Sequence, residues 1–388
     1  MTTENARELG FDPARLARVK QALEADLAAG RGHGAALVVA RRGRIVLDLV
    51  LGHADLAAGR RLERDDVFVT MSTGKQFTTA LALAFVERGL FQLHRPVAEL
   101  LPGFGAVGKE RVNLWHLLTQ TSGLPAAIPA VPPELLTSIE RMTEFVNGVA
   151  LECLPGERVS YSIALAHVVM AAMSLRADGR GRSYGRLLDD ELFRPLGMRH
   201  TSLGPRDDLL KRLCPVRAAY SGAGLFDPAA LEGIGQLLQL PGCEIPAGGF
   251  LTTIGDLHRF AEMLRGGGEL DGARILAPAT LEYASRNQTG ELPNQLWNYT
   301  VGLRNWAPFP AYIGLGFFLR GEKLTPGPWG ALNSPNTFGG IGAGSTAFWI
   351  DPARELSFAF LSTGLLEDSH HLERVARLSD LVVAALVG

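Results

Sequence analysis

The sequence predicts an α/β (α+β) fold in which one antiparallel sheet is assembled from both ends of the chain. Hairpin patterns occur near both termini, whereas helical segments and Pro- and Gly-rich loops fill the middle. With 388 residues, of which 47% are hydrophobic and 20% charged, the chain can bury a large core. We therefore expect a discontinuous sheet lobe, residues 1–89 and 299–388, flanked by helices, and an inserted, mostly helical lobe, residues 90–298.

The N-terminal part is predicted to form a helix followed by a hairpin. Apolar residues recur at helical spacing from about residue 13 to residue 29, and Gly30 ends this pattern. Two apolar runs, residues 35–40 and 45–51, are then separated by an Arg-Arg-Gly-Arg stretch. Turn chemistry between two β-rich runs indicates a pair of antiparallel strands.

The next helix and the C-terminal elements are predicted from the same signals, apolar spacing and turn residues. Residues 72–88 carry apolar side chains at helical spacing, and a glycine follows. Near the C-terminus, residues 346–350 and 356–361 flank an Asp-Pro-Ala-Arg turn, which predicts a second hairpin. A final amphipathic helix is expected over about residues 372–387, with His370-His371 in a polar approach to it.

Composition and charge exclude several classes of protein. The formal net charge is -2 and no block of like charges occurs, so a nucleic-acid-binding protein is not expected. The cysteines Cys153, Cys214 and Cys243 are widely spaced and form no Cys-x-x-Cys pair. The 9 histidines show no metal-ligand spacing. Neither a disulfide framework nor a metal site is therefore expected.

The location of the protein is predicted from its start and its apolar stretches. The first residues carry acids and lack an apolar core, so no secretory signal is expected. Together with the cysteine pattern, this favours reduced thiols and a cytoplasmic setting. The longest apolar stretch, about residues 163–175, is too short to span a membrane and is interrupted by His167, so it indicates a buried helix.

The sharpest chemical signal is Ser72-Thr73-Gly74-Lys75, at the start of a predicted helix. A hydroxyl there lies near unpaired backbone N–H groups and the positive end of the helix dipole. Ser72 and Lys75 are three residues apart, so their side chains share one helix face. A partly desolvated lysine loses its proton more easily and can help to take the serine proton. The alternative is a serine that only caps the helix, beside a solvated lysine.

Further motifs follow along the chain. They are Leu117-Leu118-Thr119-Gln120-Thr121-Ser122-Gly123-Leu124, Pro155-Gly156-Glu157 with Tyr161-Ser162, and Ala247-Gly248-Gly249-Phe250-Leu251-Thr252-Thr253 before Asp256-Leu257. With Ser72-x-x-Lys75 they resemble the class C β-lactamase-related family, over nearly the whole chain. That family includes β-lactamases, DD-peptidases, family VIII carboxylesterases and some acyltransferases. The resemblance implies a β-lactamase/transpeptidase-like fold, with the active site between the two lobes.

The resemblance also assigns a role to Tyr161. It would shuttle protons between Ser72 and the leaving group. A cationic Lys75 beside the phenol would make it easier to deprotonate, which gives the pair a physical reason. The alternative is a tyrosine that only packs in the core.

A glycine-rich stretch, residues 338–345, is the third element of the expected site. Glycines let a strand backbone approach a ligand closely. Matching Gly340-Ile341-Gly342 to the family's Lys-Thr-Gly motif makes the backbone N–H groups of Ser72 and Ala343 the donors of an oxyanion hole. Ile341 is the alternative second donor, and a flexible loop is the alternative structure.

Two departures from the family pattern bear on the substrate. β-Lactamases that resemble this chain carry Tyr-x-Asn, whereas Ile163 occupies the asparagine position here. They also carry a lysine that helps to hold the substrate carboxylate, and Gly340 occupies that position. A pocket with these replacements suits a neutral acyl group better than an anionic antibiotic.

Two other motifs are interpreted as decoys. Gly181-Arg182-Ser183-Tyr184-Gly185 matches a nucleophile elbow, but a helix rather than a strand precedes it, so Ser183 is expected to be a turn residue or helix cap. The stretch 103–108 matches a dinucleotide-binding Gly-x-Gly-x-x-Gly, but Pro102 stands where a strand should end. It is expected to be a loop.

The sequence therefore predicts a serine hydrolase that cleaves carboxylic esters through an acyl-enzyme on Ser72, with Lys75 and Tyr161 as the general base. The expected partner is a small-molecule ester or acyl donor, and no metal or organic cofactor is required. The second hypothesis is an acyltransferase of the same fold that passes the acyl group to an alcohol or amine. A β-lactamase or peptidase comes next, and a non-catalytic binding protein last. The oligomeric state stays open.

Overall fold

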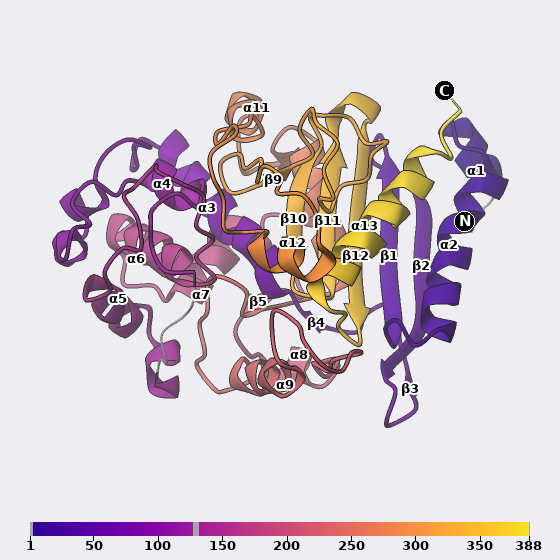
Figure 1. Ribbon diagram of the computed structural model, residues 1–388, viewed down its shortest axis with the longest axis horizontal. Coiled ribbons are helices and arrows are strands. Elements are labelled where there is room, and N and C mark those ends of the chain that lie inside the picture. Colours follow the sequence, from indigo (N-terminus) through magenta and orange to yellow (C-terminus); the bar gives the residue numbers. More distant parts are fainter. Residues whose placement is uncertain (1–2, 127–131, 388) are drawn as a thin grey trace.

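The sheet at the centre of the fold draws its strands from both ends of the chain (Figure 1). The computed structural model describes residues 3–126 and 132–387. In spatial order the strands are β3 (Arg60–Arg61), β2 (Arg44–Asp55), β1 (Gly34–Arg41), β12 (Leu356–Thr363), β11 (Thr346–Asp351), β10 (Phe338–Gly342) and β9 (Phe318–Leu319). β1 pairs with β12 antiparallel, from Gly34 with Thr363 to Arg41 with Leu356. The prediction of an antiparallel sheet assembled from both termini is confirmed.

The side chains of β1 alternate between two cores. Ala36 and Val38 belong to the core that contains helix α10 (Ile254–Arg265), whereas Leu37 and Val39 belong to the core that contains helices α2 (Pro13–Ala28) and α13 (Asp368–Val383). Successive strand residues point to opposite faces, so both faces of β1 are covered. This double coverage explains why β1 is a continuous apolar run and not an alternating one.

The two terminal helices lie against each other and against the same sheet face (Figure 1). Helix α2 begins where the sequence predicts, because the Asp12 carboxylate accepts hydrogen bonds from the backbone N–H groups of Ala14 and Arg15, at 2.8 and 3.1 Å. The ends of the chain meet where the Asp12 N–H donates to the Ala385 carbonyl at 2.8 Å.

Helix α13 begins at Asp368, earlier than the predicted residue 372. His370 and His371 therefore lie in its first turn, and the expectation of a polar approach to the helix is wrong. The apolar pattern missed this turn because polar side chains face the interior there. The buried His371, for example, has its Nε2 3.1 Å from the Thr346 carbonyl.

The predicted helix over residues 72–88 is divided in two. A 3₁₀ turn, Met71–Gly74, comes first, and α3 (Lys75–Glu87) follows it. Met71 has a φ of 49°, which no regular right-handed helix contains. Helix α3 is buried from Lys75 to Phe85, and the ring of Phe77 packs edge-on against Phe250 at 5.3 Å between centroids. The Ser72 end of α3 is thus held inside the protein.

The middle of the chain is mostly helical, as predicted. Its helices are α4 (Leu114–Leu118), α5 (Ile139–Asn147), α6 (Leu165–Asp178), α7 (Tyr184–Leu188), α8 (Asp207–Leu210), α9 (Pro228–Leu237), α10, α11 (Pro278–Ala284) and α12 (Asn298–Arg304). The short strands β4 (Phe68–Val69), β6 (Phe250–Thr252) and β5 (Ser202–Leu203) form a second sheet. Strand β7 (Glu269–Leu270) pairs with β8 (Ala273–Arg274). At the N-terminus, helix α1 (Thr3–Glu8) precedes α2. Helical turns occur at Val97–Glu99, Pro102–Gly105, Pro133–Thr137, Asp189–Phe193 and Pro352–Arg354.

Two of these helices bear on the predictions. Helix α6 is buried from Leu165 to Ser174, so the apolar stretch around His167 is a buried helix as expected. Helix α10 comes from the segment assigned to the inserted lobe, yet it packs on β11 and β12 of the large sheet. Within the described part of the chain, no helix is both long enough and apolar enough to cross a membrane.

Candidate active site

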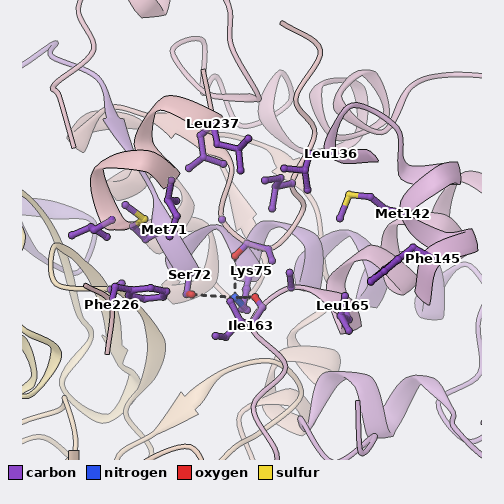
Figure 2. Close-up of a pocket in the computed structure, with 18 residues that line it drawn as sticks. Met71, Ser72, Lys75, Leu136, Met142, Phe145, Ile163, Leu165, Phe226 and Leu237 are labelled. Carbon is purple, nitrogen blue, oxygen red and sulfur yellow. Dashed lines mark hydrogen bonds between the residues drawn. The ribbon is translucent and has the colours of Figure 1, made fainter. Parts of the chain in front are cut away.

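Ser72 and Lys75 meet at the junction between the 3₁₀ turn and α3. The Lys75 ammonium nitrogen lies 3.0 Å from the Ser72 hydroxyl oxygen, 2.7 Å from the Ile163 carbonyl and 3.1 Å from the Ala247 carbonyl (Figure 2). Lys75 is only 3% exposed, and burial lowers its pKa to about 7. A lysine with that pKa is substantially neutral near pH 7 and can accept the serine proton.

His167 lies behind this pair, on helix α6. It is 2% exposed, and burial together with the charge of Lys75 lowers its pKa well below the ordinary value. A neutral imidazole is therefore packed near the lysine, and it supplies no negative charge that would keep Lys75 protonated. Sequence reasoning noted His167 only as an interruption of an apolar stretch.

Tyr161 comes to Ser72 from the irregular segment that precedes α6. The Lys75 nitrogen lies 5.0 Å from the centroid of its ring, and the phenol hydroxyl is hydrogen-bonded to Ser72. Burial raises the pKa of Tyr161 above its ordinary value, the hydrogen bond to Ser72 lowers it, and the charge of Asp368 raises it further. The net direction is opposite to the one expected from a neighbouring cationic lysine. Tyr161 is thus a protonated phenol at rest, because desolvation outweighs its other interactions.

The glycine-rich stretch is a paired strand and not a flexible loop. β10 pairs with β11 along its length and with β9 at Phe338 and Gly339, and Ala343 follows it directly. A Cβ atom on Gly342 would lie 2.7 Å from the Thr70 carbonyl, so only glycine allows β10 to approach the turn that carries Ser72 this closely.

The first of two cavities beside Ser72 is large and apolar (Figure 2). Its volume is about 380 Å³. Its walls come from the 3₁₀ turn, helices α5 and α9, the start of α6 and the segment before β6, and consist of Met71, Ser72, Lys75, Leu136, Met142, Phe145, Ile163, Ala164, Leu165, Phe226, Leu231, Ile234, Leu237, Leu238, Ile245, Ala247, Gly248 and Ala343. We call it the apolar cavity.

The second cavity is smaller and lies on the Tyr161 side of Ser72. Its volume is about 150 Å³. Its walls come from the segment around α12, from the end of β10 and from the start of α13, and consist of Ser72, Ala126, Tyr161, Ile163, Leu225, Phe226, Gln295, Leu296, Trp297, Tyr299, Thr300, Phe318, Ile341, Gly342, Ala343, Asp368, His371 and Leu372. We call it the acidic cavity because of Asp368. Ser72 and Ala343 line both cavities, so the two meet at the nucleophile.

The predicted pocket residues are distributed unevenly. Ile341 and Gly342 line the acidic cavity, whereas Gly340 lines neither cavity. Gly340 packs against Gln76 instead, so closely that a Cβ atom on it would lie 2.1 Å from the Gln76 side-chain oxygen. The segments 126–136 and 294–310 both contribute side chains to the cavities. Residues 127–131 of the first segment lie outside the described residues. Asp368 was missed, because a lone carboxylate before an amphipathic helix carries no motif.

The decoy motifs have structural roles. The Ser183 hydroxyl caps α7 by accepting a hydrogen bond from the Arg186 N–H at 3.2 Å, as expected. The stretch after Pro102 forms a short 3₁₀ turn and no strand-to-helix junction. Across residues 3–126 and 132–387, no group of three or more His, Cys, Asp or Glu side chains is arranged to hold a metal ion.

Comparisons with known proteins find similar sequences and structures over most of this chain. The sequence model of the Beta-lactamase family matches residues 19–381. The chain is 26% identical to the esterase/β-lactamase LipL of Mycobacterium tuberculosis over 385 residues, which cover 93% of this chain and 84% of that one. This resemblance extends over both sheet-forming ends and the helical middle.

Three solved structures share the fold. A penicillin-binding protein homologue from Caulobacter crescentus has a TM-score of 0.78 at 24% identity, with 97% of this chain and 99% of that chain covered. A family VIII carboxylesterase gives 0.76 at 20% identity, with 97% and 98% covered. EstCE1, described as a hydrolase with promiscuous acyltransferase activity, gives 0.75 at 21% identity, with 97% and 99% covered. At these identities the likeness establishes the fold alone, which is the β-lactamase/transpeptidase fold.

Proposed function

Since the chain belongs to the β-lactamase family, we propose that it is a serine hydrolase that cleaves carboxylic esters through an acyl-enzyme on Ser72. The observation that carries the proposal is the buried Lys75, whose nitrogen lies 3.0 Å from the Ser72 hydroxyl. A lysine with a pKa of about 7 is suited to accept the serine proton at neutral pH.

In the first step the Ser72 oxygen attacks the ester carbonyl carbon while its proton passes to Lys75. The carbonyl oxygen becomes an oxyanion, which the backbone N–H groups of Ser72 and Ala343 would stabilise. Tyr161 then donates its phenol proton to the departing alkoxide, the bond to the leaving alcohol breaks, and Lys75 returns a proton to the phenolate. A protonated resting phenol fits this donor role.

In the second step water attacks the acyl-enzyme carbonyl. The proton of the water passes to Lys75. As the ester bond to Ser72 breaks, the Ser72 oxygen takes up a proton from Tyr161, and Lys75 returns its proton to the phenolate, so the carboxylic acid is released and the resting groups are restored. No cofactor takes part in either step.

Three features support an ester over a β-lactam. Gly340 stands where related β-lactamases have the lysine that helps to hold the substrate carboxylate, and the aliphatic Ile163 lines both cavities where they have asparagine. Asp368 adds negative charge to the acidic cavity. A carboxylate-bearing antibiotic would meet repulsion there, whereas a neutral acyl chain would find an apolar wall.

Acyl transfer is the second candidate. The alternative acceptor would be an alcohol or amine that displaces water from the acyl-enzyme. The acidic cavity, which adjoins both Ser72 and Tyr161, offers room for such an acceptor. A structural neighbour described as a hydrolase with promiscuous acyltransferase activity has the same fold. Comparison of free acid with transferred product, in the presence of candidate alcohols, separates the two activities.

The proposed function is tested by removal of the nucleophile. We expect Ser72→Ala to abolish turnover of short-chain p-nitrophenyl esters and the mass shift that an ester or fluorophosphonate leaves on the intact protein. The matched control is Ser183→Ala, which removes a hydroxyl that only caps a helix. Ester turnover that survives in Ser72→Ala would reject the nucleophile, and a loss in Ser183→Ala would move the chemistry to that serine.

A further inference from the structure

The proposed acyl-enzyme chemistry does not explain the charge of the acidic cavity. Asp368, the first residue of α13, lines it, and no lysine or arginine occurs among the described residues around it. Its one histidine, His371, is buried and neutral: burial lowers its pKa well below the ordinary value, and its Nε2 lies 3.1 Å from the Thr346 carbonyl. Among the described side chains that line this cavity, Asp368 is therefore the one carboxylate, and none carries a positive charge.

The Asp368 carboxylate lacks a counter-charge. The influences on its pKa come from burial, from the negative charge of Glu367 and from two backbone hydrogen bonds, and they include no cationic side chain of the described chain. Burial and Glu367 together raise the pKa of Asp368 to about 7. A partly buried carboxylate in this situation is stabilised by any cation that enters the cavity.

The field of Asp368 extends across the cavity. Burial is the main cause of the raised pKa of Tyr161 on one wall and of Tyr299 on another, and the charge of Asp368 raises both further. The negative charge of Asp368 therefore acts on both of these walls.

Aromatic rings form much of the remaining wall. They belong to Tyr161, Phe226, Trp297, Tyr299 and Phe318. The ring of Phe318 lies 5.9 Å from that of Trp297 and 6.2 Å from that of Tyr161, so the three form a continuous surface. The faces of aromatic rings attract cations, and most strongly where water is excluded.

We infer that the acidic cavity binds the alcohol part of the substrate, and that this alcohol carries a positive charge, such as an ammonium group. The inference rests on the proposed function, in which Tyr161 protonates the leaving oxygen. Tyr161 lines the acidic cavity and not the apolar one, so the alcohol leaves on the side of Asp368. The carboxylate and the ring faces bind the cation, and the acyl chain lies in the apolar cavity.

The test uses two esters of the same shape that differ in charge. Butyrylcholine and 3,3-dimethylbutyl butyrate share the acyl group, and the ammonium nitrogen of the first is a carbon in the second. We expect kcat/KM of the wild-type protein to favour the choline ester by about tenfold or more. In Asp368→Asn, the ratio of the two kcat/KM values should fall by about tenfold. A ratio cancels any loss of activity that both esters share.

The matched control is Asp207→Asn. Asp207 is also the first residue of a helix, α8, but it is exposed and lines neither cavity. The substitution should leave the ratio within about twofold of the wild-type value, because a distant exposed charge is screened by solvent and salt. An unchanged ratio in Asp368→Asn, or a wild-type protein that treats both esters alike, would overturn the inference.

Failure of the inference can be told apart from failure of the proposed function. If no ester is turned over by a Ser72-dependent route, the proposed function fails, and calorimetric titration of the wild-type protein with choline and with 3,3-dimethylbutan-1-ol then decides the inference. Binding of choline alone supports a cation site, whereas equal binding of the two alcohols, or none, contradicts it. This measurement also applies if Asp368→Asn does not fold.

Discussion

The two cavities that meet at Ser72 have opposite characters. The apolar cavity is lined almost entirely by apolar side chains, many of them from α5, α9 and the start of α6, and its polar groups are at the nucleophile. The acidic cavity combines aromatic rings with the Asp368 carboxylate. The apolar cavity can bind an acyl chain only by burial of apolar surface, whereas the acidic cavity can discriminate between charged and neutral ligands. The comparison teaches that two cavities beside one serine can select ligands by different physical interactions, which in the proposed reaction would act on the two halves of an ester.

After Ser72, the largest expected effect belongs to Lys75, which acts on every ester whichever cavity its two halves favour. We expect Lys75→Ala to lower kcat/KM by at least about a hundredfold for every ester, because a positioned base is lost. In the wild-type protein kcat/KM should rise as the pH rises through about 7, since only the neutral amine accepts the serine proton. A flat pH profile between 6 and 8 would show that another group takes that proton.

Tyr161 should act mainly on the leaving alcohol, which lies in the acidic cavity in the proposed reaction. Tyr161→Phe is expected to lower kcat/KM by about a hundredfold for alkyl esters, whose alkoxide needs a proton, and by much less for p-nitrophenyl esters, whose phenolate leaves without one. Tyr283→Phe, at an exposed tyrosine outside both cavities, is the control. Equal losses with both kinds of ester would mean that Tyr161 does not act on the leaving group.

A third change acts on the apolar cavity alone. Ile234 on α9 lines that cavity, so Ile234→Trp should fill it and lower kcat/KM for octanoate esters by about tenfold relative to acetate esters. Ile45→Trp places the same ring on an exposed position of β2 and should leave the ratio unchanged. If Ile234→Trp instead altered the preference between esters of charged and neutral alcohols, the assignment of the acyl chain to the apolar cavity and of the alcohol to the acidic cavity would be wrong.

The two hairpins of the sheet and the pairing of Ser72 with Lys75 could be predicted because their signals are local. Hairpin signals need only neighbouring residues, and Ser72-x-x-Lys75 needs only one turn of helix. The start of α13 and the φ of Met71 could not be predicted, because buried polar partners and contacts with β10 determine them. The pKa of Tyr161 was misjudged for a similar reason, since desolvation depends on every group packed around the phenol.

The sequence by itself determined which chemical groups are available to this protein: a hydroxyl and an amine one helical turn apart, a tyrosine after Pro-Gly-Glu, and glycines that let β10 approach them. Only the tertiary structure decided how those groups behave. Burial lowers the pKa of Lys75, and the fold divides the space around Ser72 into two cavities and brings Asp368 from near the far end of the chain into one of them. Proton affinity and cavity charge depend on what lies nearby in space, and most of those neighbours are distant in sequence.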